Sequence, residues 1–259
     1  MTAASPSSGS LSVVGIGPGF ADWVTPEAAR LIHAASDLVG YAPYLDRCEL
    51  VPGQARHASD NRVELDRARA ALRLAGEGRR VAVVSGGDPG IFAMAAAVFE
   101  AIEDGEPGWR EIDVTVSPGI SAMQAAAARL GAPLGHDFCA ISLSDNLKPW
   151  ALVEKRLAAA ADADFVMALY NPASHTRREQ IRGAFALLRK LKSPATPVIF
   201  ARAIGRADER ITLCDLGDAD PDLADMATLV IVGSSGTRLL RRPNGAPFVY
   251  TPRGARAAS

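Results

Sequence analysis

The chain has 259 residues, of which 48% are hydrophobic. This length and composition suffice for one large or two modest hydrophobic cores, which excludes a disordered protein. The formal net charge is −1, so no overall electrostatic field attracts nucleic acid or an anionic membrane. We therefore expect neither as a partner, and local basic residues must meet any polyanionic ligand.

Read in chain order, the sequence first predicts a leader and a strand. Residues 1–10 lack the basic and apolar regions of a signal peptide and are expected to form a disordered leader. Leu11–Ile16 is strand-like, and Thr25-Pro26-Glu27 predicts a helix start, because it supplies a capping hydroxyl, a proline at the first helical position and an early acid. No apolar run reaches the roughly 18 residues of a membrane span.

The rest of the first half alternates strands with helices. Apolar runs and helical periodicity predict strands at Asp37–Gly40, Val81–Ser85 and Ile112–Val116, and helices at Asp60–Gly78, Ile91–Glu103 and Ser121–Leu130. A cluster of Gly and Pro at Gly131–Phe138 suits a domain junction.

After this junction the alternation starts again. Strands are expected at Cys139–Leu143, Phe165–Tyr170, Pro197–Ala201, Glu209–Leu213 and Thr228–Val232, with helices at Pro149–Ala161 and Thr176–Leu191. We therefore predict two α/β domains, residues 11–133 and 134–240, with mixed sheets and a cleft between them. Residues 241–259 are rich in Pro, Gly and Arg and are expected to be a tail outside the core.

Cysteine and histidine spacing argues against metal sites and disulfides. Cys48, Cys139 and Cys214 form no CxxC pair, so neither a disulfide framework nor a zinc site is expected, and a cytoplasmic location is favoured. The four histidines, His33, His57, His136 and His175, lack paired metal-ligand spacing, so no bound metal is expected.

The glycine cluster at Gly15–Gly19 permits a dinucleotide site, as in an NAD-dependent oxidoreductase or a nucleotide-binding module. The fingerprint G-x-G-x-x-G requires glycine where Phe20 stands, and Pro18 lacks an amide hydrogen that would bind phosphate. An acid that binds a ribose is also missing from the end of the second strand, which reads Gly40-Tyr41. These features argue against a dinucleotide site at Gly15–Gly19, and a tight turn without a ligand remains an alternative.

The stretch VVSGGDPGIF has a comparable alternative, because Asp-Pro-Gly is a common turn and Asp88 could cap the next helix. Small or bare residues nevertheless follow several strands. They are Gly15–Gly19, Ser85–Gly90, Ser117–Ser121, Tyr170–Ser174 and Gly233–Gly236. Open α/β sheets bind ligands beyond the carboxyl ends of their strands, where backbone without side chains permits close contact. Their recurrence predicts an extended ligand site.

Taken together, the motifs resemble those of the tetrapyrrole methylases. In chain order they are GIGPG, SGGDPGIF, SPGISAMQAAAARLGAPLGHDF, SLSDNLKPW, YNPASHTRREQ, ARAIGRADERI and YTPRG, from about Leu11 to Gly254. YNPASHTRR and YTPRG resemble the branch that methylates carbon 17 of precorrin-3B and contracts the ring to precorrin-4, a step of cobalamin biosynthesis. The cobalt-containing substrate cobalt-factor III, or another tetrapyrrole, remains an alternative. The absence of an iron–sulfur or other appended domain favours the metal-free substrate.

The resemblance implies S-adenosylmethionine as methyl donor, bound in the cleft between the two domains of a homodimer. The implied donor-binding residues are Gly86, Gly87, Asp88, Ile91, Phe92, Ser121, Ala122, Tyr170, Asn171, Ala203 and Thr228. Gly86 and Gly87 would let backbone groups bond the donor's methionine end. Asp88 would accept from its ammonium group or cap the following helix.

The implied substrate is an electron-rich macrocycle with many carboxylates. The Gly15–Gly19 loop, including Gly15, Gly17, Pro18 and Gly19, would line its end of the cleft. Cations in or beside the motifs would bind its carboxylates: Lys148, Arg177, Arg178, Arg206 and Arg210. Methyl transfer needs chiefly placement and exclusion of water. Ring contraction needs acid or base help, for which Asp88, His136, Asp145 and Tyr170 are the candidates.

Overall fold

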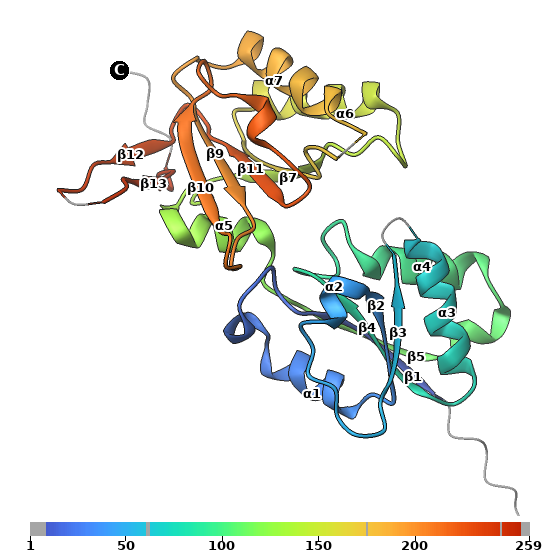
Figure 1. The fold of residues 1–259 in the computed structure, drawn as a ribbon. Helices are drawn as coiled ribbons and strands as arrows, with labels where there is room; N and C mark the ends of the chain where they lie inside the picture. The colour runs from blue at the N-terminus through green and yellow to red at the C-terminus, as the bar shows by residue number, and fades with distance from the viewer. Residues whose placement is uncertain (1–8, 61–62, 175, 244, 255–259) are drawn as a thin grey trace, which may run out of the picture. The chain divides into compact units, whose positions relative to one another are not determined.

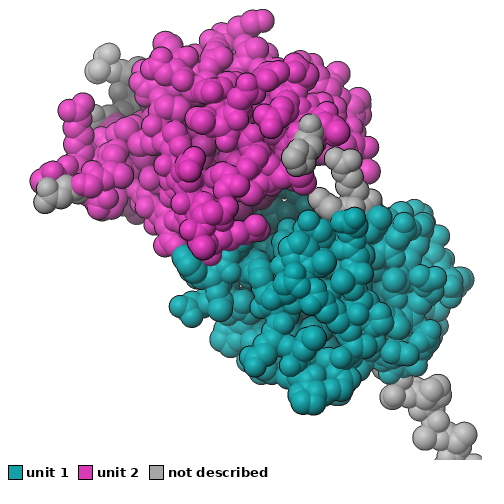
Figure 2. Space-filling model, in the orientation of Figure 1, with its two compact units in different colours: residues 1–121 teal, residues 122–259 magenta. Residues whose placement is uncertain are grey.

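The computed structural model describes residues 9–60, 63–174, 176–243 and 245–254. The chain divides into two compact units, residues 1–121 and 122–259, which Figure 2 colours separately. Within the described residues, no helix combines the length and the apolar character needed to cross a membrane.

The first unit is built on a parallel sheet of five strands (Figure 1). The strands are β1 (Ser10–Gly15), β2 (Asp37–Tyr41), β3 (Ala55–Ser59), β4 (Arg80–Ser85) and β5 (Asp113–Ser117), in the order β3-β2-β4-β1-β5. The helices are α1 (Pro26–Ala34), α2 (Ala42–Leu45), α3 (Glu64–Gly76) and α4 (Met94–Asp104), with short 3₁₀ turns at Ala21–Trp23 and Pro107–Glu111. Every pairing is parallel, so the carboxyl ends of all five strands share one edge.

Alternating side chains of the central strands form a core on each face of this sheet. Val13 and Val83 pack with residues of α3 and α4. Val14 and Val84, one position later, pack with residues of α1 and α2 on the opposite face. This alternation follows from the two-residue period of a strand. It explains why the central strands have continuous apolar sequence.

The second unit contains a mixed sheet of five strands and a smaller sheet of three (Figure 1). The large sheet has the order β10-β9-β11-β8-β7, from β7 (Phe138–Ser142), β8 (Val166–Tyr170), β9 (Pro197–Arg202), β10 (Arg210–Asp215) and β11 (Thr228–Val232). Only β7 and β8 pair in parallel there. The remaining elements are α5 (Ala122–Leu130), β6 (Gly131–Ala132), α6 (Trp150–Asp162), α7 (Glu179–Leu191), a 3₁₀ turn at Pro221–Leu223, β12 (Arg238–Leu240) and β13 (Phe248–Tyr250).

The amphipathic helices α6 and α7 cover one core of this sheet. Phe185 of α7 is fully buried and stacks on Phe200 of β9 with ring centroids 5.8 Å apart. Leu157 of α6 and Leu188 of α7 are fully buried in the same cluster. An α/β fold was predicted from the sequence, and the structure confirms it.

Two expectations about the chain ends of these units differ from the structure. Residues 241–259 were expected to lie outside the core, which is wrong for β13: Val249 is fully buried, because β13 pairs with both β12 and β6. Residues 122–133 were assigned to the first domain, whereas α5 and β6 cluster with the second unit. The predicted leader, residues 1–10, falls mostly outside the described residues.

A buried carboxylate stabilises the amino end of the first sheet. Asp37 is 1% exposed. It accepts hydrogen bonds from Ser36 Oγ (2.8 Å) and Arg79 (3.1 Å), and lies 2.7 Å from His57 Nε2. Burial alone would raise the pKa of Asp37, but the bonds from His57, Ser36 and Arg79 outweigh it and lower the pKa. The folded state therefore favours the ionised carboxylate.

We expect Asp37→Asn to lower the free energy of unfolding at pH 7 by about 2 kcal/mol, because bonds to a buried charge are lost. A lowered folded-state pKa gives stability that is complete above the unfolded pKa of about 3.9 and declines as the pH falls through the folded value. The difference between wild type and variant in urea unfolding should thus shrink from pH 7 to pH 3. A difference independent of pH would contradict this account.

Candidate active site

Three loops meet at the carboxyl edge of the first sheet, and they meet through their backbones. Gly17, after β1, pairs with Gly87, after β4, by two hydrogen bonds of 3.2 and 3.0 Å. A Cβ on Gly119, after β5, would lie 2.3 Å from the Gly87 oxygen, and one on Gly15 would lie 2.8 Å from the same atom. Side chains at Gly15 and Gly119 would therefore push the loops apart.

Asp88 joins two of these loops with its side chain. One carboxylate oxygen accepts from the Gly90 amide (2.8 Å), and the other accepts from the Gly119 amide (3.0 Å). The carboxylate thus organises its own turn and ties it to the loop after β5. The predicted helix cap is replaced by this role, because α4 begins only at Met94.

The fold requires glycine at Gly86 and at Gly87 for different structural reasons. A Cβ on Gly86 would lie 2.6 Å from the ring of Tyr44, so the fold itself excludes a side chain there. Gly87 has a left-handed backbone with φ of 69°, and the nearest described atom to an added Cβ would be the Ile120 oxygen, 4.0 Å away. The Gly87 α-carbon therefore has space beside it for a ligand.

Three predicted donor-binding residues carry backbone strain. Positive φ values occur at Phe92 (52°), Asn171 (51°) and Ala203 (50°). Among the described non-glycine residues, Asp164 is the one other case. Such conformations cost about 1–2 kcal/mol each in an L-residue, and they concentrate at functional sites. At Phe92 the strain also delays the start of α4 relative to the predicted Ile91.

In the second unit the register aligns the predicted donor residues along one sheet edge. Tyr170 ends β8 opposite Ser142 of β7. Thr228 begins β11 opposite Arg202 of β9, just before Ala203. The Tyr170 hydroxyl accepts from the Met123 amide (3.2 Å), so the first turn of α5, next to Ser121 and Ala122, lies against the end of β8.

Several groups at this edge already have partners within the chain. The Ala203 amide donates to the Ala227 oxygen (2.9 Å), and the Ala203 oxygen accepts from the Arg206 amide (3.0 Å). Thr228 Oγ1 donates to Asp225 (2.6 Å). Burial alone would raise the pKa of Asp225, but the bonds from Thr228 and Arg202 outweigh it and lower the pKa. A donor bound at Ala203, as the motifs predict, would bond the second lone pair of its carbonyl oxygen.

Four of the five predicted substrate cations lie in loops at this same edge, and the fifth, Arg210, begins β10 there. Arg177 is the most enclosed: its guanidinium donates to the Leu143 oxygen (3.2 Å) and the Asn171 oxygen (2.9 Å), and its side chain is 12% exposed. Arg178, Arg206 and Arg210 are exposed. Burial, and secondarily the charge of Arg156, lowers the pKa of Lys148. Arg177 thus supports the loops, while the other four present charge at the edge.

The predicted acid–base candidates do not all come together. Asp145 accepts from Gln180 (2.8 Å) and lies 4.0 Å from Arg177, at the carboxyl end of β7 near Tyr170. His136 precedes β7 and therefore lies at the opposite end of that strand, where its Nδ1 accepts from the Asp137 amide (2.7 Å). Asp88 belongs to the first unit. The roles of all four residues stay predictions.

Two residues that support the loops of the first unit, Tyr44 and Arg47, could not be predicted from sequence motifs. Tyr44 packs against Gly86, and Arg47 donates to carbonyls of the Gly15–Gly19 loop. Both contacts join segments distant in sequence. Within the described residues, no group of three or more His, Cys, Asp or Glu side chains is placed to hold a metal, and His175 lies outside them.

Comparison with known proteins identifies the family. The profile of the Tetrapyrrole (Corrin/Porphyrin) Methylases matches residues 10–220. The chain belongs to this family of methyltransferases. The resemblance predicted from the motifs is thereby confirmed.

Among relatives, a Sinorhizobium precorrin-3B C(17)-methyltransferase is 58% identical over 95% of this chain and 96% of its own. A probable cobalt-factor III C(17)-methyltransferase of Salmonella typhimurium is 42% identical over 94% of this chain and 98% of its own.

Among solved structures, the methyltransferase CobJ has a TM-score of 0.89 and 51% identity, covering 95% of this chain and 100% of that one. A uroporphyrin-III C-methyltransferase of Thermus thermophilus, complexed with S-adenyl homocysteine, shares the fold with a TM-score of 0.64 and 23% identity, covering 87% of this chain and 97% of that one.

We expect Gly87→Ala to destabilise the fold by about 1–2 kcal/mol, because an L-residue disfavours its left-handed backbone, and to reduce methyltransferase activity at least tenfold. Gly53→Ala is the matched control: Gly53 has φ of 88°, and no described residue lies within 4 Å of its added Cβ. It should lose comparable stability and keep its activity. Thermal unfolding and initial rates measure both effects. Equal activity losses in the two variants would show that Gly87 matters only for folding.

Proposed function

We propose that the chain methylates precorrin-3B at carbon 17, with ring contraction to precorrin-4, in cobalamin biosynthesis. The observation that carries this proposal is the 58% identity, over nearly the full length of both chains, to a precorrin-3B C(17)-methyltransferase. Identity to the probable cobalt-factor III enzyme is lower, at 42%. This difference favours the metal-free substrate.

The proposed methyl donor is S-adenosylmethionine, which supplies a methyl group already activated on a sulfonium sulfur. The chain offers features that fit such a group. Gly87 has an open α-carbon, which suits close backbone contact with an amino-acid moiety. Left-handed backbone at Phe92, Asn171 and Ala203 marks the family-matched positions as geometrically specified. We assign donor binding to these segments, together with Asp88, Ser121 and Tyr170.

The chain's own residues would act chiefly by placement. Asp88 holds the loops after β4 and β5 together through its two amide contacts. The exposed cations Arg178, Arg206 and Arg210 would pair with acetate and propionate groups of the substrate. Asp145 and Tyr170 lie at the same sheet edge and are the proposed proton carriers for ring contraction. We further propose a cytoplasmic homodimer, on the family resemblance and the unpaired cysteines.

Incubation with precorrin-3B and methyl-labelled S-adenosylmethionine tests the reaction directly. We expect a product that gains one labelled methyl group and shows the absorbance change of a contracted ring. Cobalt-factor III in a parallel incubation should react more slowly, and a reaction without the donor should give no product. Donor binding without label transfer would indicate a binding module. Calorimetric binding of NAD would instead support the oxidoreductase alternative.

Asp88→Ala should lower kcat/KM for the donor about tenfold to a hundredfold, because two amides lose a charged acceptor that contributes about 1.5–3 kcal/mol per bond. The fold should be retained, as judged by far-UV circular dichroism. Asp113→Ala removes an exposed carboxylate from the amino end of β5 and is the control. Unchanged kinetics in Asp88→Ala would count against the assigned donor site.

A further inference from the structure

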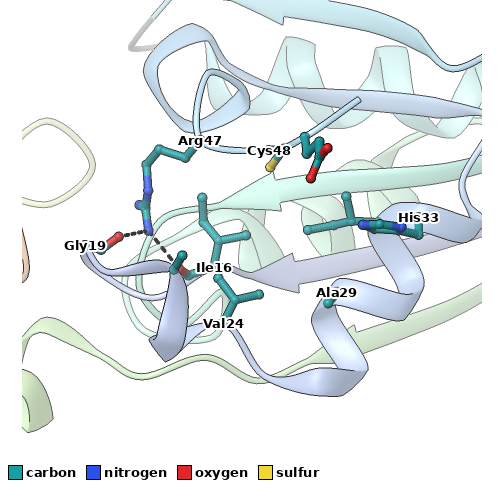
Figure 3. Close-up of a pocket in the computed structure, with 10 residues that line it drawn as sticks. Ile16, Gly19, Val24, Ala29, His33, Arg47 and Cys48 are labelled. Atoms are coloured by element: carbon teal, nitrogen blue, oxygen red, sulfur yellow. Dashed lines mark hydrogen bonds between the residues drawn. The ribbon is translucent and has the colours of Figure 1, made fainter. Parts of the chain in front are cut away.

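Arg47 reaches beneath the Gly15–Gly19 loop from the segment that follows α2. Its guanidinium donates to the oxygens of Ile16 (2.8 Å), Gly19 (2.9 Å) and Gly17 (3.1 Å). Figure 3 shows the side chain extended toward this loop. Arg47 also lines a hollow of about 320 Å³. One side chain thus binds three carbonyls of a single loop.

The three carbonyl oxygens of this loop face the same guanidinium, and without a cation between them their partial negative charges would repel one another. The loop adopts this curvature partly because Gly17 has a left-handed backbone, with φ of 66°. Arginine suits the position since its planar fork presents several donors in fixed directions, whereas a lysine ammonium is a compact point charge. A guanidinium therefore fits these three carbonyls better than an ammonium group would.

The Gly15–Gly19 loop is in turn bonded to the loop after β4, which contains Gly86 and Gly87. The Gly17 oxygen that accepts from Arg47 also accepts from the Gly87 amide, at 3.0 Å. Three residues before Arg47, the Tyr44 ring fills the space where a Gly86 side chain would lie. Residues 44–47 consequently support both the loop after β1 and the loop after β4.

We propose that Arg47 is a positioning residue for methyl transfer: it fixes the Gly15–Gly19 loop and, through Gly17, the Gly87 peptide. This inference rests on the proposed function. Direct substrate binding is disfavoured, because Arg47 is half-buried and its Nη1 and Nη2 atoms donate to backbone carbonyls. Arg47 acts through the loops that contact the reactants.

Kinetics of Arg47→Met and Arg47→Lys test the proposal. Methionine keeps the length without donors, and lysine keeps the charge without the fork. We expect kcat to fall at least tenfold in both variants, with a smaller change in KM for precorrin-3B, because the loop loses its geometry and no substrate contact is removed. Arg69→Met is the control, since Arg69 is exposed on α3, where it pairs with Asp66, and lies outside the residues 44–47 that support the loops. It should retain wild-type constants.

Chemical rescue separates positioning from a general loss of stability. In Arg47→Ala, the vacated space adjoins the hollow lined by Ile16, Val24 and Ile32, which a small cation can enter. Ethylguanidinium should restore a measurable part of kcat, and ethylammonium at equal concentration should not. Rescue by both cations, or wild-type kcat in Arg47→Lys, would overturn the proposal. So would kinetic losses that match the loss of folded protein.

The wild-type enzyme distinguishes failure of this inference from failure of the proposed function. If wild type transfers no methyl group to precorrin-3B, the proposed function is wrong. The Arg47 proposal is then judged by calorimetric binding of S-adenosylhomocysteine, for which we expect at least tenfold weaker affinity in Arg47→Met than in Arg69→Met. Equal affinities would overturn it. If wild type is active, the kinetic comparison decides.

Discussion

The Gly87 carbonyl oxygen is the point about which the first unit's site is organised. Two other loops approach it so closely that a single Cβ on Gly15 or Gly119 would occupy its space. Contact between bare backbones lets three strand ends present peptide groups in one small region. Asp88 and Arg47 then fix this arrangement from two sides, one as an anion accepting amides and the other as a cation donating to carbonyls.

The second unit orders its edge by a different means, since its key positions carry side chains in left-handed backbone. The left-handed backbone at Asn171 and Ala203 is energetically unfavourable, and hydrogen bonds to neighbouring residues hold each of the two in place. Asn171 donates to Ser142 and accepts from Arg177, while Ala203 is held by bonds to Ala227 and Arg206. The buried stack of Phe185 on Phe200 anchors the strands that lead there. Strain at the edge is thus supported by packing in the core.

Sequence patterns predicted the strands and helices whose apolar periodicity is local, and the glycine-rich ends where loops meet. They failed where a distant partner decides the structure. Val249 is buried because β13 pairs with β12 and with β6, which lies more than a hundred residues earlier in the chain. Arg47 and Tyr44 carry no motif, since their role follows from where α2 places them. His136 lies within a family motif, but strand direction places it at the opposite end of β7 from Asp145. Spacing in sequence does not reveal such directions.

Gly86 and Gly87 differ in what the lack of a side chain says about a bound ligand. Gly86 is explained by Tyr44, because the ring already occupies the position of any side chain. Its lack of a side chain is therefore no evidence for a donor. Gly87 requires glycine for its backbone conformation, yet no described residue comes nearer than 4.0 Å to a Cβ added on its open side. The argument for a ligand thus rests on Gly87 and on the direction in which the Gly17–Gly87 pair and Asp88 hold its peptide groups.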